Sequence, residues 1–318
     1  MRTLFVGTGA IGLPSLKWLL AYSQAEVVAV VTQPDKAAGR HRTLTPGPVK
    51  TFALEASLPV LQAPKIRAPE SLAEIAGFTP ELIVCMAYGQ ILPVALLNLP
   101  PRGCLNLHAS LLPKYRGAAP IQAAISAGDL ETGITVMWMD AGLDTGDVLL
   151  QKTEPIHADD TAGTLHDRLG LTAATALATA WPLLVSGSAP RQAQDADLAS
   201  HAPKLDAASG RIVWTRTAIE IERHIRAMQP WPGASALLPP AQGAAPRLCK
   251  IQSAALVHDV SGPPGSVLAA GREGIVVACG TGAISIHRLR PEGRASMAAA
   301  DFLNGHPISI GAMCPDAA

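Results

Sequence analysis

The sequence predicts an α/β protein with a doubly wound, mostly parallel sheet, followed by a small β-barrel domain. In the first region, apolar runs rich in Val, Ile, Leu and Ala alternate with amphipathic segments, which is the pattern of strands separated by helices. Toward the end of the chain, short apolar runs are separated by Gly and Pro turns, which is typical of a barrel. A polar stretch between the two regions indicates a linker.

The first region contains the elements of the predicted sheet. Residues 27–31 form an uninterrupted β-branched and alanine run, typical of a parallel strand that is covered on both faces. The expected strands are 4–6, 27–31, 60–61, 82–86, 104–108 and 134–139, and the expected helices are 13–22, 48–55, 71–76, 118–127 and 161–184.

The second region has a different pattern. One helix is expected at 218–228, and short apolar runs follow at 235–238, 248–251, 274–278 and 283–287. We therefore predict a catalytic domain over residues 1–188, a linker over 189–206 and a barrel domain over 207–318.

Composition and charge limit the class of protein. The 318 residues include 25 Lys and Arg and 25 Asp and Glu, with 48% hydrophobic residues, which excludes a disordered chain. Residues 1–206 have 15 basic and 18 acidic side chains, and residues 207–318 have 10 and 7, so the net charges are −3 and +3. The excess of bases in the second region permits a polyanionic partner, although an ordinary solvated surface explains it equally well.

The five cysteines suggest neither disulfides nor a metal site, because no two of them lie close together in the sequence. Two uncharged runs, 82–101 and 169–190, are interrupted by prolines, so we expect buried elements rather than membrane spans. The N-terminal apolar run contains a glycine-rich turn and Pro14 before any plausible cleavage site, which argues against a signal peptide. We expect a cytoplasmic protein.

A Gly-rich turn follows the first strand. Residues 7–12, Gly-Thr-Gly-Ala-Ile-Gly, match the GxGxxG pattern of dinucleotide sites. Such a site needs an acid at the end of the second strand, where this chain has Val31, Thr32 and Gln33; Asp35 follows only after a proline. We therefore interpret the motif as a structural turn.

The fifth predicted strand ends in two polar side chains. Residues two apart on a strand share a face, so Asn106 and His108 point to one side and Leu105 and Leu107 to the other. The carboxyl ends of parallel strands line the ligand crevice of an open α/β sheet, which makes this a candidate site. As an isolated pattern, the pair could instead satisfy neighbouring loop backbone.

Residues 139–147, Met-Asp-Ala-Gly-Leu-Asp-Thr-Gly-Asp, form a Gly-rich loop after the next predicted strand, and we expect this loop at the same sheet edge. Asp144 could reach His108 from there; spacing alone leaves Asp140 and Asp147 open. An amide donor and a carboxylate-supported imidazole suit acyl transfer through an oxyanion. No Ser or Cys stands out as a nucleophile, which favours direct attack by the substrate.

These motifs resemble a known family. Residues 106–117, Asn-Leu-His-Ala-Ser-Leu-Leu-Pro-Lys-Tyr-Arg-Gly, and residues 142–147 are similar to the signature of formyltransferases that use 10-formyltetrahydrofolate. The similarity includes residues 32–40, 86–89, 117–122 and 225–232, and within the family it is strongest to the members that act on methionyl-tRNA. In place of the family's usual proline and acid after the first Gly-Thr, this chain has Gly9 and Ala10.

The resemblance implies a Rossmann-like first domain, an OB-like second domain and a role for each matching residue. It implies that Asn106, His108 and Asp144 are catalytic, that Tyr88, Gly89, Ser110, Leu111, Leu112 and Pro113 bind folate, and that Lys36, Arg40 and Arg42 lie in a loop that meets tRNA. The basic composition of residues 34–48 suits phosphate contact by itself, although a solvated loop is the default.

The implied reaction is formyl transfer from 10-formyltetrahydrofolate to the α-amine of methionine on initiator methionyl-tRNA. We expect a monomer without a metal and without a membrane partner. A sugar-nucleotide or ribonucleotide formyltransferase would share Asn106, His108 and Asp144, so it stays an alternative, as does a nucleic-acid-binding module without catalysis.

Overall fold

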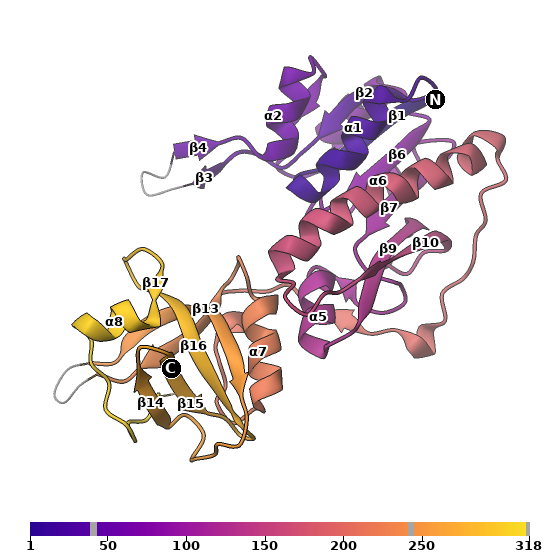
Figure 1. Ribbon diagram of the computed structural model, residues 1–318. Helices are drawn as coiled ribbons and strands as arrows, with labels where there is room; N and C mark the ends of the chain where they lie inside the picture. The colour runs from indigo at the N-terminus through magenta and orange to yellow at the C-terminus, as the bar shows by residue number, and fades with distance from the viewer. Residues whose placement is uncertain (39–42, 241–244, 316–318) are drawn as a thin grey trace. The chain divides into compact units, whose positions relative to one another are not determined.

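The computed structural model describes residues 1–38, 43–240 and 245–315 (Figure 1). The chain folds into two compact units. The first unit comprises Met1–Pro120, Glu131–Pro155 and Leu165–Pro203, and the second comprises Ile121–Leu130, Ile156–Thr164 and Lys204–Ala318.

A seven-stranded sheet forms the centre of the first unit, with the strand order β10-β9-β7-β6-β1-β2-β5. Its strands are β1 (Arg2–Gly7), β2 (Glu26–Val31), β5 (Val60–Leu61), β6 (Leu82–Met86), β7 (Cys104–His108), β9 (Glu131–Trp138) and β10 (Val148–Pro155). The neighbouring pairs from β7 to β5 are parallel, and β9 runs antiparallel to both β7 and β10. The predicted α/β class with a mostly parallel sheet is confirmed.

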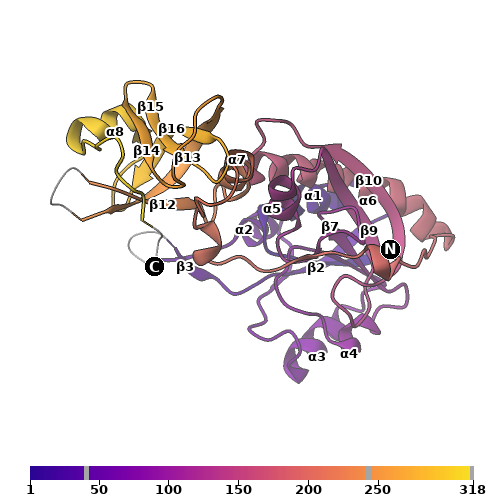
Figure 2. The same cartoon turned by 90° about the horizontal axis from the view of Figure 1, so that it is seen from below.

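Helices cover both faces of this sheet, as Figure 2 shows. Helices α1 (Leu13–Ala21) and α6 (Ala162–Ser186) share one face, where the rings of Trp18 and Trp181 meet edge to face at 5.5 Å. On the other face, α3 (Pro69–Gly77) and α4 (Val94–Leu97) contribute Ile75 and Leu96 to an apolar cluster with Ile83 and Cys85. Helix α2 (Pro48–Glu55) also belongs to the first unit. The β-branched strand runs are buried because both faces are covered.

The direction of β9 corrects one expectation. The sequence predicts the 139–147 loop at the carboxyl edge of the strand that is β7, and it predicts no strand where β10 lies. Because β9 is antiparallel to β7, Trp138 lies opposite Leu105, and the Met139 amide donates to the Cys104 carbonyl at 2.8 Å. The loop therefore begins near the amino end of β7 as the connection of a β9–β10 hairpin. An apolar run does not reveal strand direction, so the expected starting point of the loop was wrong, although its Asp144 reaches His108 at the carboxyl end of β7.

The second unit is built on an antiparallel sheet with the order β12-β13-β16-β15-β14, and β17 pairs with β16. Its elements are α5 (Pro120–Ala127), which begins at the last residue of the first unit, α7 (Ala218–Ala227), β12 (Ala234–Leu238), β13 (Arg247–Val257), β14 (Val267–Gly271), β15 (Gly274–Ala278), β16 (Ala283–Pro291), β17 (Met297–Ala298) and α8 (Ala299–Gly305). The sheet is consistent with the predicted small barrel; β14, β17 and α8 were not predicted.

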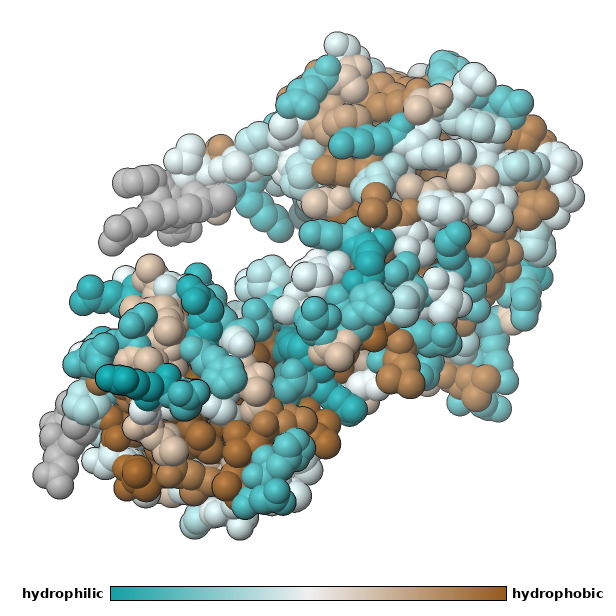
Figure 3. Space-filling view, viewed as in Figure 1, coloured by the Kyte–Doolittle hydropathy of each residue, from teal (hydrophilic) through white to brown (hydrophobic). Residues whose placement is uncertain are grey.

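By length and composition, helix α6 is apolar enough to cross a membrane. No other helix in the part of the chain that the structure describes meets this criterion. Half of its most apolar window is buried in the structure, and Leu169, Ala173 and Leu177 have no exposed surface. Figure 3 shows hydrophilic residues among the apolar ones along its visible side. The helix is therefore a core helix, and it continues past Pro182 to Ser186.

Candidate active site

Three side chains that the sequence singled out lie together. The Asn106 amide Nδ2 donates to the Asp144 Oδ1 at 3.2 Å, and the His108 Nδ1 lies 3.6 Å from the Asp144 Oδ2. The side chains of His108 and Asp144 are 6% and 14% exposed. The site is thus largely withdrawn from water, where electrostatic interactions are stronger than in solvent.

Strand alternation explains the placement of Asn106 and His108. Asn106 lies opposite Cys85 in the parallel β6–β7 pair, on the face that α3 and α4 cover. Leu105 and Leu107 point to the other face and are fully or almost fully buried. The sequence therefore directs one pair of β7 side chains into the core and the other toward the 139–147 loop.

Two carboxylates of the 139–147 loop have different partners. Asp140 stabilises the loop itself, because its carboxylate accepts hydrogen bonds from the Gly142 amide and the Thr145 hydroxyl. Asp144 adopts a left-handed backbone conformation, with φ of 54°, and presents its carboxylate to β7. Of the acids in this loop that spacing left as possible partners of His108, Asp144 contacts both Asn106 and His108.

A further donor holds the Asp144 carboxylate. The Gly117 amide, in the short strand β8 (Arg116–Gly117), donates to the Asp144 Oδ2 at 2.9 Å. Gly117 has a φ of 117°, and a Cβ there would collide with the carbonyl of Ala202, so no larger residue fits without movement. The Asn106 amide has two hydrogens, of which Asp144 uses one; the other is available to a second acceptor.

Both ring nitrogens of His108 face oxygen atoms. Its Nε2 lies 3.0 Å from the Tyr115 carbonyl, while its Nδ1 faces Asp144. A ring with one proton can donate to only one of these oxygens, and a ring with two protons can donate to both. The surroundings therefore fix the plane of the ring and accommodate a proton on either nitrogen.

Residues 110–113 are held by side chains that no sequence motif indicates. The Thr135 hydroxyl donates to the Ser110 carbonyl at 2.6 Å, and the Gln151 amide donates to the Leu112 carbonyl at 2.7 Å. Ser110 is fully buried and its hydroxyl donates to the Lys114 carbonyl, whereas Leu111 and Pro113 are half-buried. Thr135 and Gln151 lie on β9 and β10, and the unpredicted antiparallel hairpin is why no sequence signal pointed to them.

Tyr88 and Gly89 follow β6 at the carboxyl edge of the sheet. The Tyr88 carbonyl accepts hydrogen bonds from Thr8 and Gln33, and its ring is buried. Among the described residues its hydroxyl has no hydrogen-bond partner, and burial, with a smaller effect of Cys85, raises the pKa of Tyr88 to about 12. Gly89 is exposed and has a φ of 88°, which glycine adopts without strain.

The GxGxxG turn packs closely against the sheet. A Cβ at Gly7 would lie 2.8 Å from the Met86 carbonyl, and one at Gly12 would lie 3.0 Å from the Phe5 ring. Gly9 has a φ of −75°, an angle that proline also adopts, so the departure at this position preserves a turn that proline could form. Asp35, the nearest acid to the second strand, is paired with Lys50 at 2.7 Å.

The structure describes residues 34–38 and 43–48 of the loop that is predicted to meet tRNA. Lys36 is exposed in strand β3 (Lys36–Ala38), which pairs with β4 (Thr43–Thr45) in a two-stranded hairpin. Arg40 and Arg42 lie outside the described residues. Hydrogen bonds from Lys50 and Gln62 hold the pKa of Asp35 below its ordinary value at the base of this loop.

Comparison with known proteins identifies the family. A model of the formyl transferase family matches residues 1–180, and a model of the formyl transferase C-terminal domain matches residues 204–307. The chain belongs to the formyl transferase family. It is 45% identical to a methionyl-tRNA formyltransferase of Geobacter sulfurreducens over 98% of this chain and 96% of that protein. It is 48% identical to one of Xanthomonas axonopodis pv. citri over 96% of this chain and 97% of that protein.

Solved structures share the formyl transferase fold at lower identity. An N-formyltransferase from Helicobacter canadensis, in complex with folinic acid and dTDP-3-aminofucose, is 18% identical with a TM-score of 0.64 and covers 90% of this chain and 99% of that one. HypX from Aquifex aeolicus, in complex with tetrahydrofolic acid, is 19% identical with the same TM-score, and the match covers 95% of this chain and 47% of that chain. These likenesses concern the fold.

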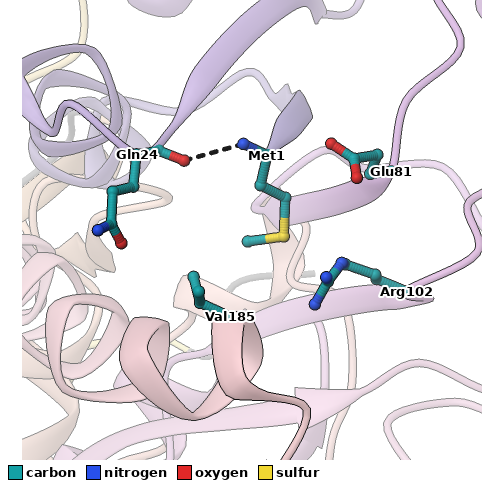
Figure 4. Close-up of a pocket in the computed structure, with 5 residues that line it drawn as sticks. All are labelled: Met1, Gln24, Glu81, Arg102 and Val185. Atoms are coloured by element: carbon teal, nitrogen blue, oxygen red, sulfur yellow. Dashed lines mark hydrogen bonds between the residues drawn. The ribbon is translucent and has the colours of Figure 1, made fainter.

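One cavity of this formyl transferase has none of the candidate-site residues in its lining (Figure 4). It has a volume of about 310 Å³ and is lined by Met1, Gln24, Glu81, Arg102 and Val185. Met1, Glu81 and Arg102 precede the parallel strands β1, β6 and β7, so the cavity is at the amino edge of the sheet. No group of three metal-ligating side chains occurs among the residues that the structure describes.

Proposed function

We propose that this protein transfers the formyl group of 10-formyltetrahydrofolate to the α-amine of methionine on initiator methionyl-tRNA, as a monomer in the cytoplasm. The observation that supports this function most strongly is identity of 45–48% to methionyl-tRNA formyltransferases over nearly the whole chain, including both family domains. Binding of folinic acid and tetrahydrofolic acid by two proteins of the same fold supports a folate donor.

We assign the transition-state contacts to Asn106 and His108. Attack of the amine on the formyl carbon places negative charge on the formyl oxygen, and the second N–H of Asn106 is a donor for that oxygen. His108 moves the proton between the amine and the departing folate nitrogen, while Asp144 orients its ring. Fixed donors in a site with little exposed surface need no reorganisation during the reaction, which is why they lower the barrier.

The folate site is assigned to the carboxyl edge around Tyr88 and residues 110–113. Ser110 and Leu112 are buried; the Ser110 hydroxyl donates to the Lys114 carbonyl, and the Leu112 amide donates to the Thr135 hydroxyl on β9. The contacts available to a donor molecule there are therefore Leu111, Pro113 and the remaining backbone. Gly89 is exposed beside the buried Tyr88 ring and leaves room for a ligand to approach the backbone.

Acceptor binding is assigned to basic residues of both units. In the second unit, Lys250 on β13 lies directly opposite Arg290 on β16, and burial together with Arg290 lowers the pKa of Lys250. Like charges opposite one another destabilise a sheet, and a phosphate backbone would relieve the repulsion. Arg288 is also exposed on β16. In the first unit, Lys36, Arg40 and Arg42 belong to the predicted tRNA loop.

The test is a formyl-transfer assay with 10-formyltetrahydrofolate and three acceptors: charged initiator tRNA, the same tRNA without methionine, and an amino-sugar nucleotide. We expect transfer to the charged tRNA alone, with an efficiency that falls steeply as salt is added. Transfer to the sugar nucleotide alone would contradict the proposed acceptor and leave the folate donor in place. Binding of tRNA without any transfer would contradict the enzyme assignment itself.

A further inference from the structure

The segment after α6 lies against the first unit. We call residues 190–202 the strap. The Trp138 indole donates to the Pro190 carbonyl at 3.0 Å, and Gln192 pairs with Val148 through two backbone hydrogen bonds of 2.8 and 3.0 Å. The composition of this segment predicts part of a linker between domains, residues 189–206. The contacts give it a fixed path beside the 139–147 loop.

Gln194 of the strap uses its whole amide group on residues of the candidate site. Its Nε2 donates to the carbonyl of Asp144 at 2.9 Å and to the carbonyl of Gly146 at 2.7 Å. Its Oε1 accepts from the Nε and Nη2 of Arg116 at 3.1 and 2.8 Å. Arg116 is 8% exposed, so this arrangement forms largely away from water.

The 139–147 loop needs such support because of its path. The loop begins near the amino end of β7, yet Asp144 contacts His108, the last residue of that strand. Asp144 has a left-handed backbone, which disfavours residues other than glycine, and Gly146 approaches the Trp138 carbonyl too closely for any Cβ. The two hydrogen bonds of Gln194 span this strained part of the loop.

The far end of the strap supports the other half of the site. The Tyr115 amide donates to the Ser200 hydroxyl at 2.9 Å, and the Arg116 amide donates to the Ser200 carbonyl at 2.8 Å. Strand β11 (His201–Ala202) then pairs in parallel with β8. Tyr115 is the residue whose carbonyl faces His108, so one segment of chain holds the backbone on both sides of the His108–Asp144 pair.

We propose that Gln194, held by Arg116, is a positioning residue that keeps the Asp144 carboxylate aligned with Asn106 and His108. This inference rests on the proposed function for its turnover readout. Gln194 touches no reacting group; it acts through the backbone of Asp144 and Gly146. Without the hydrogen bonds of Gln194, the Asp144 carboxylate is no longer held in alignment. The rate of the chemical step then falls, while the folate and tRNA contacts stay in place.

The deciding variant is Gln194→Glu, which keeps the length and the acceptor for Arg116 and removes both N–H donors. We expect kcat to fall by about tenfold to a hundredfold, the size that small misplacements of a catalytic group produce, with KM for folate and tRNA within about twofold of the wild type. Gln194→Met removes every side-chain hydrogen bond of this residue and should change kcat and KM in the same way. The matched control is Gln192→Glu, since the Gln192 side chain is exposed and only its backbone pairs with Val148.

A double-mutant cycle distinguishes a positioning role of Gln194 from a purely structural one. If Gln194 acts through Asp144, Gln194→Glu should reduce kcat no further in a protein that already has Asp144→Ala. If the kcat losses of Gln194→Glu and Asp144→Ala multiply in the double variant, the proposal is overturned. An equal rise of both KM values in Gln194→Glu, with kcat unchanged, would also overturn it.

Hydrogen exchange of residues 139–147 gives a readout that does not depend on the proposed function. Faster exchange in both Gln194 variants and not in Gln192→Glu supports the proposal even if the wild type formylates no acceptor tested. Unchanged exchange overturns it whatever the turnover. Wild-type inactivity toward all three acceptors would contradict the proposed function and leave this result standing.

Discussion

The two units of the protein arrange their polar groups differently. In the first unit, hydrogen bonds join segments that are distant in sequence: Asn106 to Asp144, 38 residues apart, and Tyr115 to Ser200, 85 apart. In the second unit, Lys250 and Arg290 are opposed like charges on neighbouring strands, and Arg290 is exposed.

This difference matches two kinds of task. A reacting group must be held to a fraction of an ångström, which requires donors fixed from several directions. Attraction of a polyanion requires only a field of one sign, so exposed side chains are sufficient. If the units divide these tasks, chemistry should depend on the first unit, and attraction of the acceptor should depend in part on exposed bases of the second.

The largest effect is expected for Asn106→Ala. Loss of the proposed oxyanion donor should reduce kcat by about a hundredfold or more, since such donors contribute on the order of 3 kcal/mol to the transition state. The measurement is steady-state formyl transfer with both substrates varied. Asn98→Ala, at an exposed position after α4, is the control and should retain wild-type kcat. Near-normal turnover of Asn106→Ala would remove this residue from the mechanism.

A smaller effect is expected for Arg290→Glu. Replacing Arg290, which we propose contacts phosphate, should raise KM for tRNA several-fold, leave kcat unchanged and reduce the salt slope of binding by about one. The control is Arg272→Glu, an exposed base in the turn between β14 and β15. Equal losses in both variants would indicate that net charge alone matters; a fall in kcat would contradict the division between the units.

The stability of the second unit depends on a local feature of α7. Thr217 and Glu220 form a capping box, in which the Glu220 amide donates to the Thr217 hydroxyl and the Thr217 amide donates to the Glu220 carboxylate. Thr217→Ala should destabilise this unit by about 1 kcal/mol without changing kcat. Urea denaturation, with the exposed Thr215→Ala as control, measures this effect; an unchanged midpoint would contradict it.

The smallest effect concerns pH and the base of the 34–48 loop. Hydrogen bonds from Lys50 and then Gln62 lower the pKa of Asp35 from 3.8, so the folded state binds this proton less readily than the unfolded state. The stabilisation is therefore present above about pH 4 and disappears as the pH falls through the lower folded value. The difference in urea midpoint between wild type and Lys50→Met should shrink from pH 7 to pH 3. A difference that does not change with pH would show that the ion pair is not its source.

The sequence was sufficient for the parts of the site that follow from local periodicity. Alternation along β7 predicted that Asn106 and His108 share a face, and residues 48–55 were predicted as the helix that α2 forms. The loop with Asp144 was identified from its glycines and acids, and the resemblance to formyltransferases selected Asp144 among three candidates.

The sequence was insufficient where tertiary contacts decide. The direction of β9 depends on pairing with β7, and an apolar run has no polarity. Three supporting side chains are single polar residues whose partners are distant in the sequence: Thr135, Gln151 and Gln194. Gln151 and Thr135 are 16 residues apart, and Gln194 and Arg116 are 78 residues apart. Such contacts leave no local pattern, and the composition of the strap resembled that of a linker.

The central claim, that the first unit performs the chemistry and the second unit contributes to attracting the acceptor, is tested most directly by the double variant Asn106→Ala/Arg290→Glu. The measurement is kcat/KM for charged initiator tRNA in the wild type, both single variants and the double variant. The account predicts that the two losses multiply, with free energies additive within about 0.5 kcal/mol, as for independent sites. A double variant no worse than Asn106→Ala alone would contradict it.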